Sequence, residues 1–326
     1  MRVVILGGTR FIGRAVVEEL VARGHDVLVV HRGQHEPPDL APVEHLHADR
    51  TKLRLVRGEL NEFRPDAAVD VSAMNGAQAD AALRALPDGI RLVALSSGDV
   101  YRAFASVHSG IHTDAVPLDE TAPLRERRFL VAPHDENLEV EERYLARGAV
   151  ILRLGAVYGE HDYQRRQEFV LRRVRARRRR MPIGDGAFLF SRCYVVAVAV
   201  RLALEHGPSG EIFNVAEQST WSMRLLAEKV VQAAVAKPEL VTVNAALLPA
   251  DLRITALSRQ HLLMDSHKIR SLGWRDTDAD EALRQTVAWD LAHPPRGGEV
   301  DGTSERLGGE PDEFEADDAA LASVSE

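Results

Sequence analysis

Two glycines, Gly7 and Gly13, follow a short apolar run at the start of the chain, where residues 3–13 read Val-Val-Ile-Leu-Gly-Gly-Thr-Arg-Phe-Ile-Gly. The apolar run predicts a buried strand, and the amphipathic residues after it predict a helix. A tight turn between them would direct backbone N–H groups and the positive end of the helix at one point, an arrangement that binds phosphate groups. The stretch therefore predicts a site for the pyrophosphate of a dinucleotide. We expect its contacts to come from Gly7, Thr9, Arg10, Phe11, Ile12 and Gly13.

The end of the second expected strand indicates which dinucleotide binds. Sites that prefer NAD often carry Asp or Glu here to accept hydrogen bonds from the ribose 2′-hydroxyl. This chain has Arg32 instead, with Arg10 expected nearby. Because guanidinium groups suit a 2′-phosphate, we predict NADP in preference to NAD. Solvated arginines, or arginines stacked on the adenine, are the alternative interpretation. Asp49, after the third expected strand, is a candidate for contact with the adenine amino group.

The elements that must position these residues alternate along the first 155 residues. Strands are expected at 3–6, 26–30, 45–48, 67–72, 92–97 and 149–153, and helices near 11–23, 51–64, 77–86 and 135–147. Such alternation predicts an α/β fold of the Rossmann type, a doubly wound parallel sheet covered by helices on both faces. Ligands of these sheets bind beyond the carboxyl ends of the strands.

The regular alternation of expected strands and helices ends after residue 155. We expect a nucleotide-binding domain over residues 1–160, with segments near 190–216 returning to it. A smaller substrate lobe is expected over 161–296, including an arginine-rich helix at 164–180, a strand at 211–215 and helices at 223–235 and 278–291. The last segment, 297–326, has ten acidic residues and one arginine and is rich in Gly, Ser and Ala. We predict that this tail is disordered.

Amino-acid composition limits the classes of protein to which the chain can belong. The chain has 326 residues, 45% of them hydrophobic, which is enough for a sizeable core. Its formal charge of −8 comes from the acidic tail, because the rest is nearly neutral. Cys193 is the single cysteine, so no internal disulfide can form and a reducing compartment is expected. The start lacks the layout of a signal peptide, and no apolar stretch is long enough to span a bilayer. We therefore expect a cytoplasmic protein.

Further motifs lie downstream in one order. They are Ser-Ser-Gly-Asp-Val-Tyr at 96–101, Pro-Leu-Asp-Glu at 117–120, Leu-Arg-Leu-Gly-Ala-Val-Tyr-Gly at 152–159, Gly-Asp-Gly at 184–186, Gly-Glu-Ile-Phe-Asn-Val at 210–215 and Lys-Ile-Arg-Ser-Leu-Gly-Trp at 268–274. With residues 7–13, they resemble the extended short-chain dehydrogenase/reductases, the NAD-dependent epimerase/dehydratase family. The Gly-Gly-Thr-Arg variant is similar to its atypical branch, which includes chloroplast stem-loop RNA-binding proteins.

The resemblance implies a set of catalytic residues, only part of which is present. In this family a Ser orients the substrate oxygen, a Tyr moves a proton, and a Lys binds the nicotinamide ribose and lowers the pKa of the Tyr. Ser97 matches the serine. The Tyr-x-x-x-Lys pair is missing, because its positions are held by Pro133 and Asn137. Candidate replacements as proton donor are His134, whose ordinary pKa of about 6.5 suits the task, and Tyr101; Tyr144 is a further option.

Three accounts of the function stay open. In the first, the chain is an oxidoreductase or epimerase whose acid has been replaced, acting at a carbinol or keto carbon of a sugar nucleotide or a secondary metabolite. In the second, it binds nucleotide without redox turnover, as a scaffold or RNA-binding protein. In the third, it catalyses a different reaction on the same scaffold. Fold alone does not decide between them.

Other residues bear on substrate and partners. The resemblance places Arg192 and Tyr158 near the substrate, and it implies that a homodimer is common. Seven arginines among residues 172–180 could bind RNA or phosphate, or form a solvated helix face. Because aromatic residues are not interleaved with them, nucleic acid is the less favoured partner. The histidines at 31, 35, 45 and 47 match no familiar zinc spacing, so we expect them to be scattered and predict no metal site.

Overall fold

The computed structural model describes residues 1–126, 136–194, 196–295 and 314–324. Its main sheet has seven parallel strands in the order β10-β6-β5-β4-β1-β2-β3. This is the predicted Rossmann-type α/β fold. The strands are β1 (Arg2–Leu6), β2 (Asp26–His31), β3 (Glu44–His47), β4 (Ala67–Asp70), β5 (Arg91–Ser97), β6 (Val150–Leu154) and β10 (Ile212–Val215).

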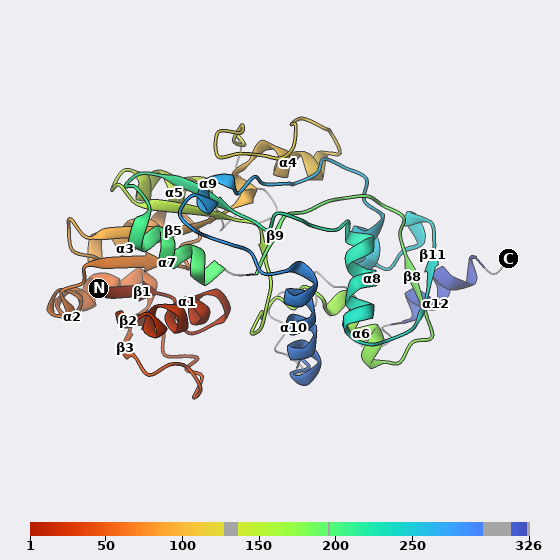
Figure 1. Ribbon diagram of the computed structural model, residues 1–326, viewed down its shortest axis with the longest axis horizontal. Helices are drawn as coiled ribbons and strands as arrows, with labels where there is room; N and C mark the ends of the chain where they lie inside the picture. Colours follow the sequence, from red (N-terminus) through yellow and green to blue (C-terminus); the bar gives the residue numbers. More distant parts are fainter. Residues whose placement is uncertain (127–135, 195, 296–313, 325–326) are drawn as a thin grey trace.

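Helices cover both faces of this sheet (Figure 1). Successive side chains of a strand point to opposite faces, so Val3 and Ile5 of β1 pack in one core cluster while Val4 and Leu6 pack in another. The first cluster includes α1 (Phe11–Ala22) and α7 (Val196–His206). The second includes the 3₁₀ helix η1 (Arg50–Val56), α2 (Arg57–Phe63), α3 (Gly76–Ala85) and α5 (Asn137–Leu145).

β10 lies at the edge of the main sheet although it comes after part of the lobe in the chain. It pairs in parallel with β6, and α7 before it packs against α1. Two short strands, β7 (Ala156–Val157) and β9 (Arg192–Cys193), pair with each other. The segment 190–216 therefore contributes elements to the sheet-bearing part of the molecule, while the boundaries of the two expected domains stay a prediction.

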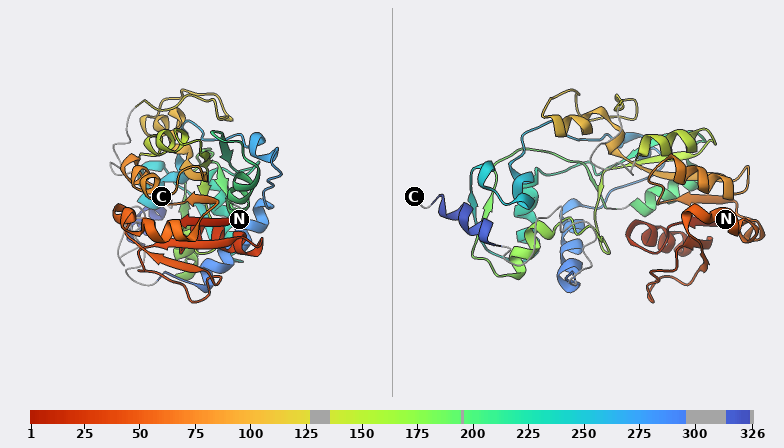
Figure 2. Two further views of the ribbon diagram at one scale, coloured as in Figure 1. Left: turned by 90° about the vertical axis from the view of Figure 1, so that its left-hand side faces the viewer. Right: turned by 180° about the vertical axis from the view of Figure 1, so that it is seen from behind.

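A smaller lobe lies at the opposite end of the molecule from the N-terminus (Figures 1 and 2). Helices and a two-stranded parallel sheet together form a separate hydrophobic core in this lobe. The lobe elements are α6 (Glu168–Arg175), β8 (Arg180–Ile183), α8 (Met223–Ala233), β11 (Glu239–Thr242), η3 (Ala245–Leu247), η4 (Ala250–Ala256), α10 (Ala279–Ala292) and α12 (Glu315–Ala322). The remaining elements are η2 (Gly98–Val100), α4 (Arg102–Ser109) and α9 (His267–Arg270).

Two predictions in this lobe were wrong. The expected helix at 164–180 ends at Arg175, and Arg180 already begins β8. The expected disorder of the acidic tail does not hold for residues 315–322, which form α12. Asp317 and Leu321 of α12 are buried against the lobe, so tertiary contacts order a segment whose composition favoured disorder. Residues 297–313 and 325–326 of the tail lie outside the described residues.

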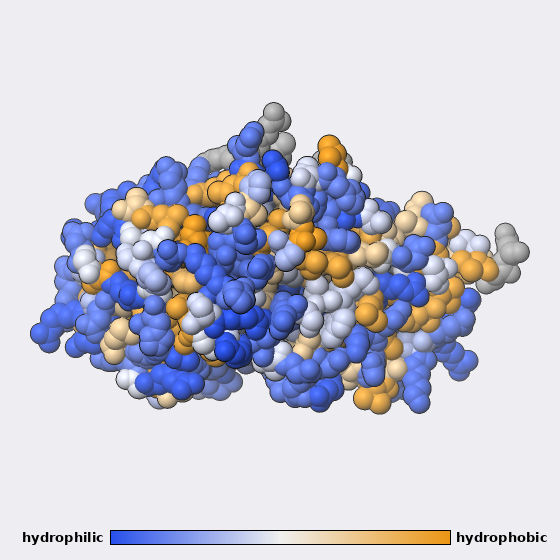
Figure 3. All heavy atoms as spheres, turned by 45° about the horizontal axis from the view of Figure 1, so that its top comes forward, coloured by the Kyte–Doolittle hydropathy of each residue, from blue (hydrophilic) through white to orange (hydrophobic). Residues whose placement is uncertain are grey.

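No helix among the described residues is long and apolar enough to cross a membrane. On the face that Figure 3 shows, apolar residues lie in small groups among hydrophilic ones.

Candidate functional site

A large cavity of about 1140 Å³ opens at the carboxyl ends of the central strands. Residues after β1, β2, β4, β5 and β6 line it, together with segments at 163–166, 190–191 and 262–264. The carboxyl edge of a parallel sheet is where ligands of doubly wound folds bind. Both expected ends of a nucleotide site, the glycine turn and Ser97, face this one cavity.

The glycine turn is shaped by close backbone contacts. A Cβ at Gly13 would lie 2.0 Å from the carbonyl oxygen of Gly7, so only glycine lets α1 approach the turn. Gly7 has φ +94°, and a Cβ there would lie 2.6 Å from Ser72 Oγ. These two positions need glycine for space and, at Gly7, for its backbone conformation.

The N-terminus of α1 has no side-chain cap. α1 shares this with α2, α4, α6 and α12, whereas Asn75, Ser222 and Asp278 each accept a hydrogen bond from the first turn of the helix that they precede, α3, α8 and α10. Arg10, the residue before α1, accepts none. The first amides of a helix need partners, and those of α1 open toward the cavity that Arg10, Phe11, Ile12 and Gly13 line. This arrangement suits a bound anion, so the residues present fit the pyrophosphate of a dinucleotide.

One end of the cavity, beyond β2 and β3, contains Arg32 and Asp49. Arg32 is exposed, which leaves its guanidinium accessible to a ligand phosphate. Asp49 caps η1: its Oδ1 accepts hydrogen bonds from Thr51 N at 2.9 Å and Thr51 Oγ1 at 2.5 Å. The hydroxyl of Thr51 thereby lowers the pKa of Asp49. The side chain of Asp49 already has a structural role, and its contact with adenine stays a prediction.

Histidines that are spread along the sequence come together beside this end. His31 Nε2 lies 2.8 Å from His45 Nδ1 and 3.6 Å from Glu36 Oε1, while His47 Nε2 lies 2.5 Å from Glu36 Oε1. The expectation of scattered histidines was therefore wrong. Gly33 N–H donates to His31 Nδ1 at 3.1 Å. One ligand atom from each of His31, Glu36 and His45 lies within 4.8 Å of the other two. The expectation of no metal site therefore stays a prediction.

A polar part of the cavity wall lies directly after β5. Ser97 Oγ accepts a hydrogen bond from Asp99 N at 3.2 Å, and both residues line the cavity. Asn137, which stands at the position of the family lysine, donates from Nδ2 to the two carboxylate oxygens of Asp99 at 3.1 and 2.9 Å. Asn137 also lines the cavity. Ser97, Asp99 and Asn137 thus form one polar group at its wall.

Asp99 has the properties of an acid–base group. Its side chain is 23% exposed. Burial raises its pKa to about 6, against the opposing charge of Arg125. A carboxyl group with that pKa exchanges a proton near neutral pH. Sequence reasoning missed Asp99, although it lies within the Ser-Ser-Gly-Asp-Val-Tyr motif; the signal was a carboxylate two residues after Ser97.

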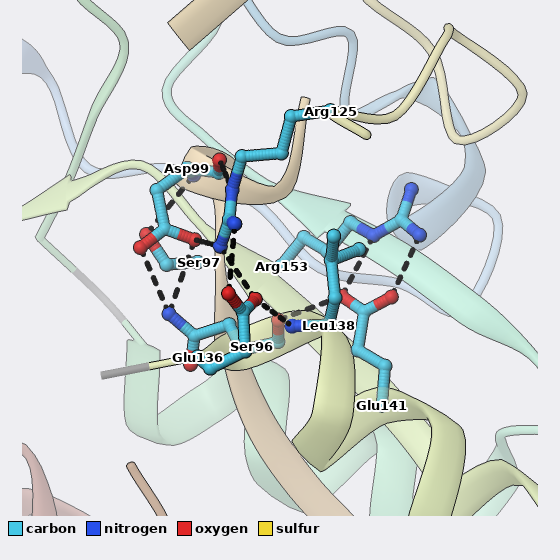
Figure 4. Close-up of polar contacts among 9 residues, drawn as sticks. Ser96, Ser97, Asp99, Arg125, Glu136, Leu138, Glu141 and Arg153 are labelled. Carbon is cyan, nitrogen blue, oxygen red and sulfur yellow. Dashed lines mark hydrogen bonds and ion pairs between the residues drawn. The ribbon is translucent and has the colours of Figure 1, made fainter. Parts of the chain in front are cut away.

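A buried ion pair holds the backbone around Asp99. Arg125 donates to Glu136 Oε1 at 2.8 Å and Oε2 at 3.0 Å, and its Nε donates to the carbonyl of Asp99 at 2.7 Å. Its Nη2 lies 3.9 Å from Asp99 Oδ1. Figure 4 shows this pairing of Arg125 with Glu136. Glu136 immediately precedes α5, which carries Asn137. The pair therefore ties the start of α5 to the loop of Asp99 and fixes the distance between Asn137 and Asp99.

The other predicted catalytic residues do not join this group. Tyr101 is fully buried, its hydroxyl donates to Asn214 Oδ1 at 2.7 Å and accepts from Arg153 at 3.1 Å, and it does not line the cavity. Burial raises its pKa. Tyr144 is likewise buried, with its hydroxyl 2.5 Å from Asp70 Oδ2. These packed positions disfavour both tyrosines as proton donors. His134 and Pro133 lie outside the described residues.

The predicted substrate residues Arg192 and Tyr158 are buried against each other and do not line the cavity. The guanidinium of Arg192 lies 3.8 Å from the ring centroid of Tyr158. Neither Nη atom of Arg192 has a hydrogen-bond partner among the described residues. Burial lowers the pKa of Arg192. As the structure stands, Arg192 is not presented to a ligand in the cavity.

Most of the arginine run at 172–180 is engaged within the protein. Arg173 is buried and pairs with Asp251 at 2.7 Å and with Asp317 of α12 at 2.6 Å. The other ion pairs are Arg172–Asp251, Arg175–Glu168, Arg178–Asp318 and Arg180–Glu239. Arg177 and Arg179 are exposed and line a second cavity of about 290 Å³ with Lys237. The acidic helix α12 therefore neutralises part of the basic run.

Comparison with known proteins gives relatives in two functional classes. The chain is 24% identical over 329 residues to the chloroplast stem-loop binding protein of 41 kDa b of Arabidopsis thaliana, covering 94% of this chain and 83% of that protein. It is 32% identical over 170 residues to 2′-dehydrokanamycin reductase of Streptomyces kanamyceticus, covering 48% of this chain and 43% of the reductase. The chain thus matches less than half the length of the reductase.

Solved structures share the fold at low identity. The dTDP-glucose 4,6-dehydratase of Bacillus anthracis, in complex with NAD, is 15% identical with a TM-score of 0.70, covering 90% of this chain and 97% of that one. The UDP-glucose 4-epimerase of Thermotoga maritima, with UDP-glucose, is 18% identical with a TM-score of 0.67, covering 90% and 99%. The model of the NAD dependent epimerase/dehydratase family matches residues 3–216. The chain belongs to the NAD-dependent epimerase/dehydratase family.

Proposed function

We propose that this protein is an NAD(P)-dependent oxidoreductase or epimerase that acts at a carbinol or keto carbon of a small molecule. One observation carries the proposal: the uncapped start of α1 and the polar group Ser97–Asp99–Asn137 face the same cavity. A nicotinamide dinucleotide bound there would supply the hydride acceptor or donor. Gly7, Gly13 and the first turn of α1 would hold its pyrophosphate.

Residues of the chain would orient the substrate and transfer the proton. Ser97 would orient the substrate oxygen with its hydroxyl. Asp99 would take the proton of a carbinol as base, or return it to a carbonyl as acid. Asn137 would hold the Asp99 carboxylate in place through its two hydrogen bonds. Asp99 and Asn137 thus substitute for the missing tyrosine and lysine, without the cation that the lysine would provide.

We propose NADP as the preferred cofactor, because Arg32 stands where NAD-specific sites carry a carboxylate. Titrating the protein with NADPH and NADH, followed by cofactor fluorescence, tests this. Arg32→Asp should weaken NADPH binding at least tenfold more than NADH binding, because it replaces a charge-assisted donor with a repelling carboxylate. Arg57→Asp, an equal charge change on exposed α2, is the control. Equal losses for both cofactors would refute the preference.

Turnover is tested with a deuterium-labelled nicotinamide cofactor and a panel of ketones and secondary alcohols. We expect label transfer by the wild-type protein, and its loss in Ser97→Ala and Asp99→Asn with cofactor affinity retained. Transfer that persists in Asp99→Asn would exclude Asp99 as the acid–base group.

The second candidate is nucleotide or RNA binding without turnover. The similarity to a stem-loop binding protein and the exposed Arg177, Arg179 and Lys237 favour it. Under this function, replacing the three residues by alanine should weaken RNA binding and flatten its salt dependence. An absence of RNA binding at low salt would eliminate it.

A further inference from the structure

Part of the wall of the main cavity, beside the polar group, is apolar. Five side chains that belong to one hydrophobic cluster also line the cavity beside the polar group. They are Phe104, Leu118, Phe190, Leu262 and Met264. We call these five residues the apolar wall.

Backbone hydrogen bonds make the apolar wall a fixed surface. Leu118 N donates to the carbonyl of Leu263 at 2.6 Å, and Leu262 N donates to the carbonyl of Leu189 at 3.0 Å. Ser191 Oγ accepts from Met264 N at 2.8 Å. Three segments that are far apart in the sequence are therefore joined edge to edge, and this fixes the position of their side chains.

The apolar wall adjoins the acid–base group. A Cβ placed on Gly98 would lie 2.7 Å from Met264 Sδ, so Met264 packs on the backbone between Ser97 and Asp99. The substrate end of the cavity therefore has two unlike sides. One offers Ser97, Asp99 and Asn137 to an oxygen, and the other offers hydrocarbon surface. Small-molecule sites combine a few such polar groups with apolar lining.

Among the described residues, the arginines at the substrate end are already engaged within the protein. Arg166 lines the cavity and is 38% exposed, and its Nε donates to the carbonyl of Val157 at 2.6 Å. Arg192 is buried and does not line the cavity, and Arg125 is buried in its pair with Glu136. Arg50 lines the cavity but is paired with Asp70 at 2.5 Å. Arg10 and Arg32 lie at the cofactor end. Above its pKa of about 6 the Asp99 carboxylate would repel a diphosphate further.

The cavity does not extend to the lobe helices α6 and α8. No residue of α6 or α8 is among the described residues that line it. Its volume of about 1140 Å³ must hold the dinucleotide as well as the substrate, and pockets for one drug-sized ligand commonly take ~300–1,000 Å³. What remains beside Ser97 suits a small molecule.

We propose that the substrate is a small ketone or secondary alcohol with a hydrocarbon body, and that it carries no nucleoside diphosphate. The hydrocarbon body packs on the apolar wall, and the reacting oxygen faces Ser97 and Asp99. This inference rests on the proposed function and narrows its substrate class. It departs from the UDP-glucose found with one structural relative.

Saturation-transfer NMR on the full chain loaded with NADP tests the proposal, with acetophenone and UDP-glucose as probes. We expect saturation transfer to acetophenone and none to UDP-glucose. Phe190→Asp should weaken acetophenone binding at least tenfold, and Phe104→Ser, on a different element, should weaken it in the same direction. Leu247→Gln, an exposed lobe position at 48% accessibility, is the control and should change nothing.

The outcomes separate this proposal from the proposed function. NADPH affinity is measured on every variant and shows that each one is folded. Failure of the wild-type protein to bind any nicotinamide cofactor would refute the proposed function. When the cofactor binds, three outcomes would overturn the substrate proposal. The first is that UDP-glucose binds and that Arg192→Met abolishes this binding. The others are that acetophenone does not bind, or that its affinity is unchanged by substitutions in the apolar wall.

Discussion

At the scale of single residues, Gly13 is the most constrained position of the candidate site. Gly13→Ala places a methyl group 2.0 Å from the Gly7 carbonyl, so the start of α1 must move away from the turn. We expect NADPH affinity to fall at least tenfold and the free energy of unfolding to fall by about 1–3 kcal/mol, as overpacking does. Gly58→Ala is the matched control, because nothing lies within 4 Å of its Cβ position. If Gly13→Ala binds NADPH with unchanged affinity, the cofactor does not bind at the glycine turn.

The raised pKa of Asp99 predicts how the free energy of unfolding depends on pH. Because burial raises its pKa in the folded state to about 6 from an ordinary 3.8, the folded protein binds the proton more tightly than the unfolded chain. Its contribution to stability is therefore present below about pH 4 and is lost as pH rises through about 6. Urea unfolding of wild type and Asp99→Asn between pH 4 and 8 checks this. The variant should gain up to about 3 kcal/mol relative to wild type across that window.

Other buried carboxyl groups are present in both proteins and cancel in this difference. Asp290, whose pKa burial also raises to about 6, is the main one. A difference between Asp99→Asn and wild type that stays constant with pH would show that Asp99 titrates normally. Alcohol oxidation supplies a second readout, because a base must be deprotonated: its rate should rise through about pH 6 in wild type only.

At the scale of elements, α12 is attached to the lobe by a buried charge. Arg173 is 1% exposed and bonds both Asp251 and Asp317, whereas Asp318 on the same helix is 62% exposed in its pair with Arg178. Asp317→Ala leaves Arg173 with one partner fewer in the interior, so we expect a loss of about 3–5 kcal/mol. Asp318→Ala should cost no more than about 1 kcal/mol. Chemical unfolding of both variants measures this, and equal small losses would show that α12 is not anchored there.

At the scale of the whole molecule, the cavity joins the sheet to the lobe. Its lining includes the glycine turn, Ser97 and the lobe-side residues Gln164, Phe190 and Met264. NADPH at a concentration of 100 Kd should stabilise the fold by about 2.7 kcal/mol, because it binds only the native state. Hydrogen exchange should then show added protection at both residues 7–13 and 97–100. Protection confined to the first segment would mean that the bound molecule does not reach Ser97.

Sequence patterns alone determined the parts of this protein that depend on local order. The apolar run before Gly7 and the spacing to Gly13 predict strand, turn and helix, because each requirement lies within about a dozen adjacent residues. Alternating strands and helices likewise predict the parallel sheet, since parallel strands need crossover connections. Ser97 was predicted for the same reason, as part of a contiguous motif after β5.

Only the tertiary structure decided which distant side chains meet. Asp99 and Asn137 lie 38 residues apart and become partners because β5 and α5 pack together. The apolar wall draws on four separate segments, and α12 folds because Arg173, 144 residues away, accommodates Asp317. Burial then sets the chemistry: it raises the pKa of Asp99, and it withdraws Tyr101 and Arg192 from the cavity. Desolvation and long-range contact depend on the packed fold, and no local pattern encodes them.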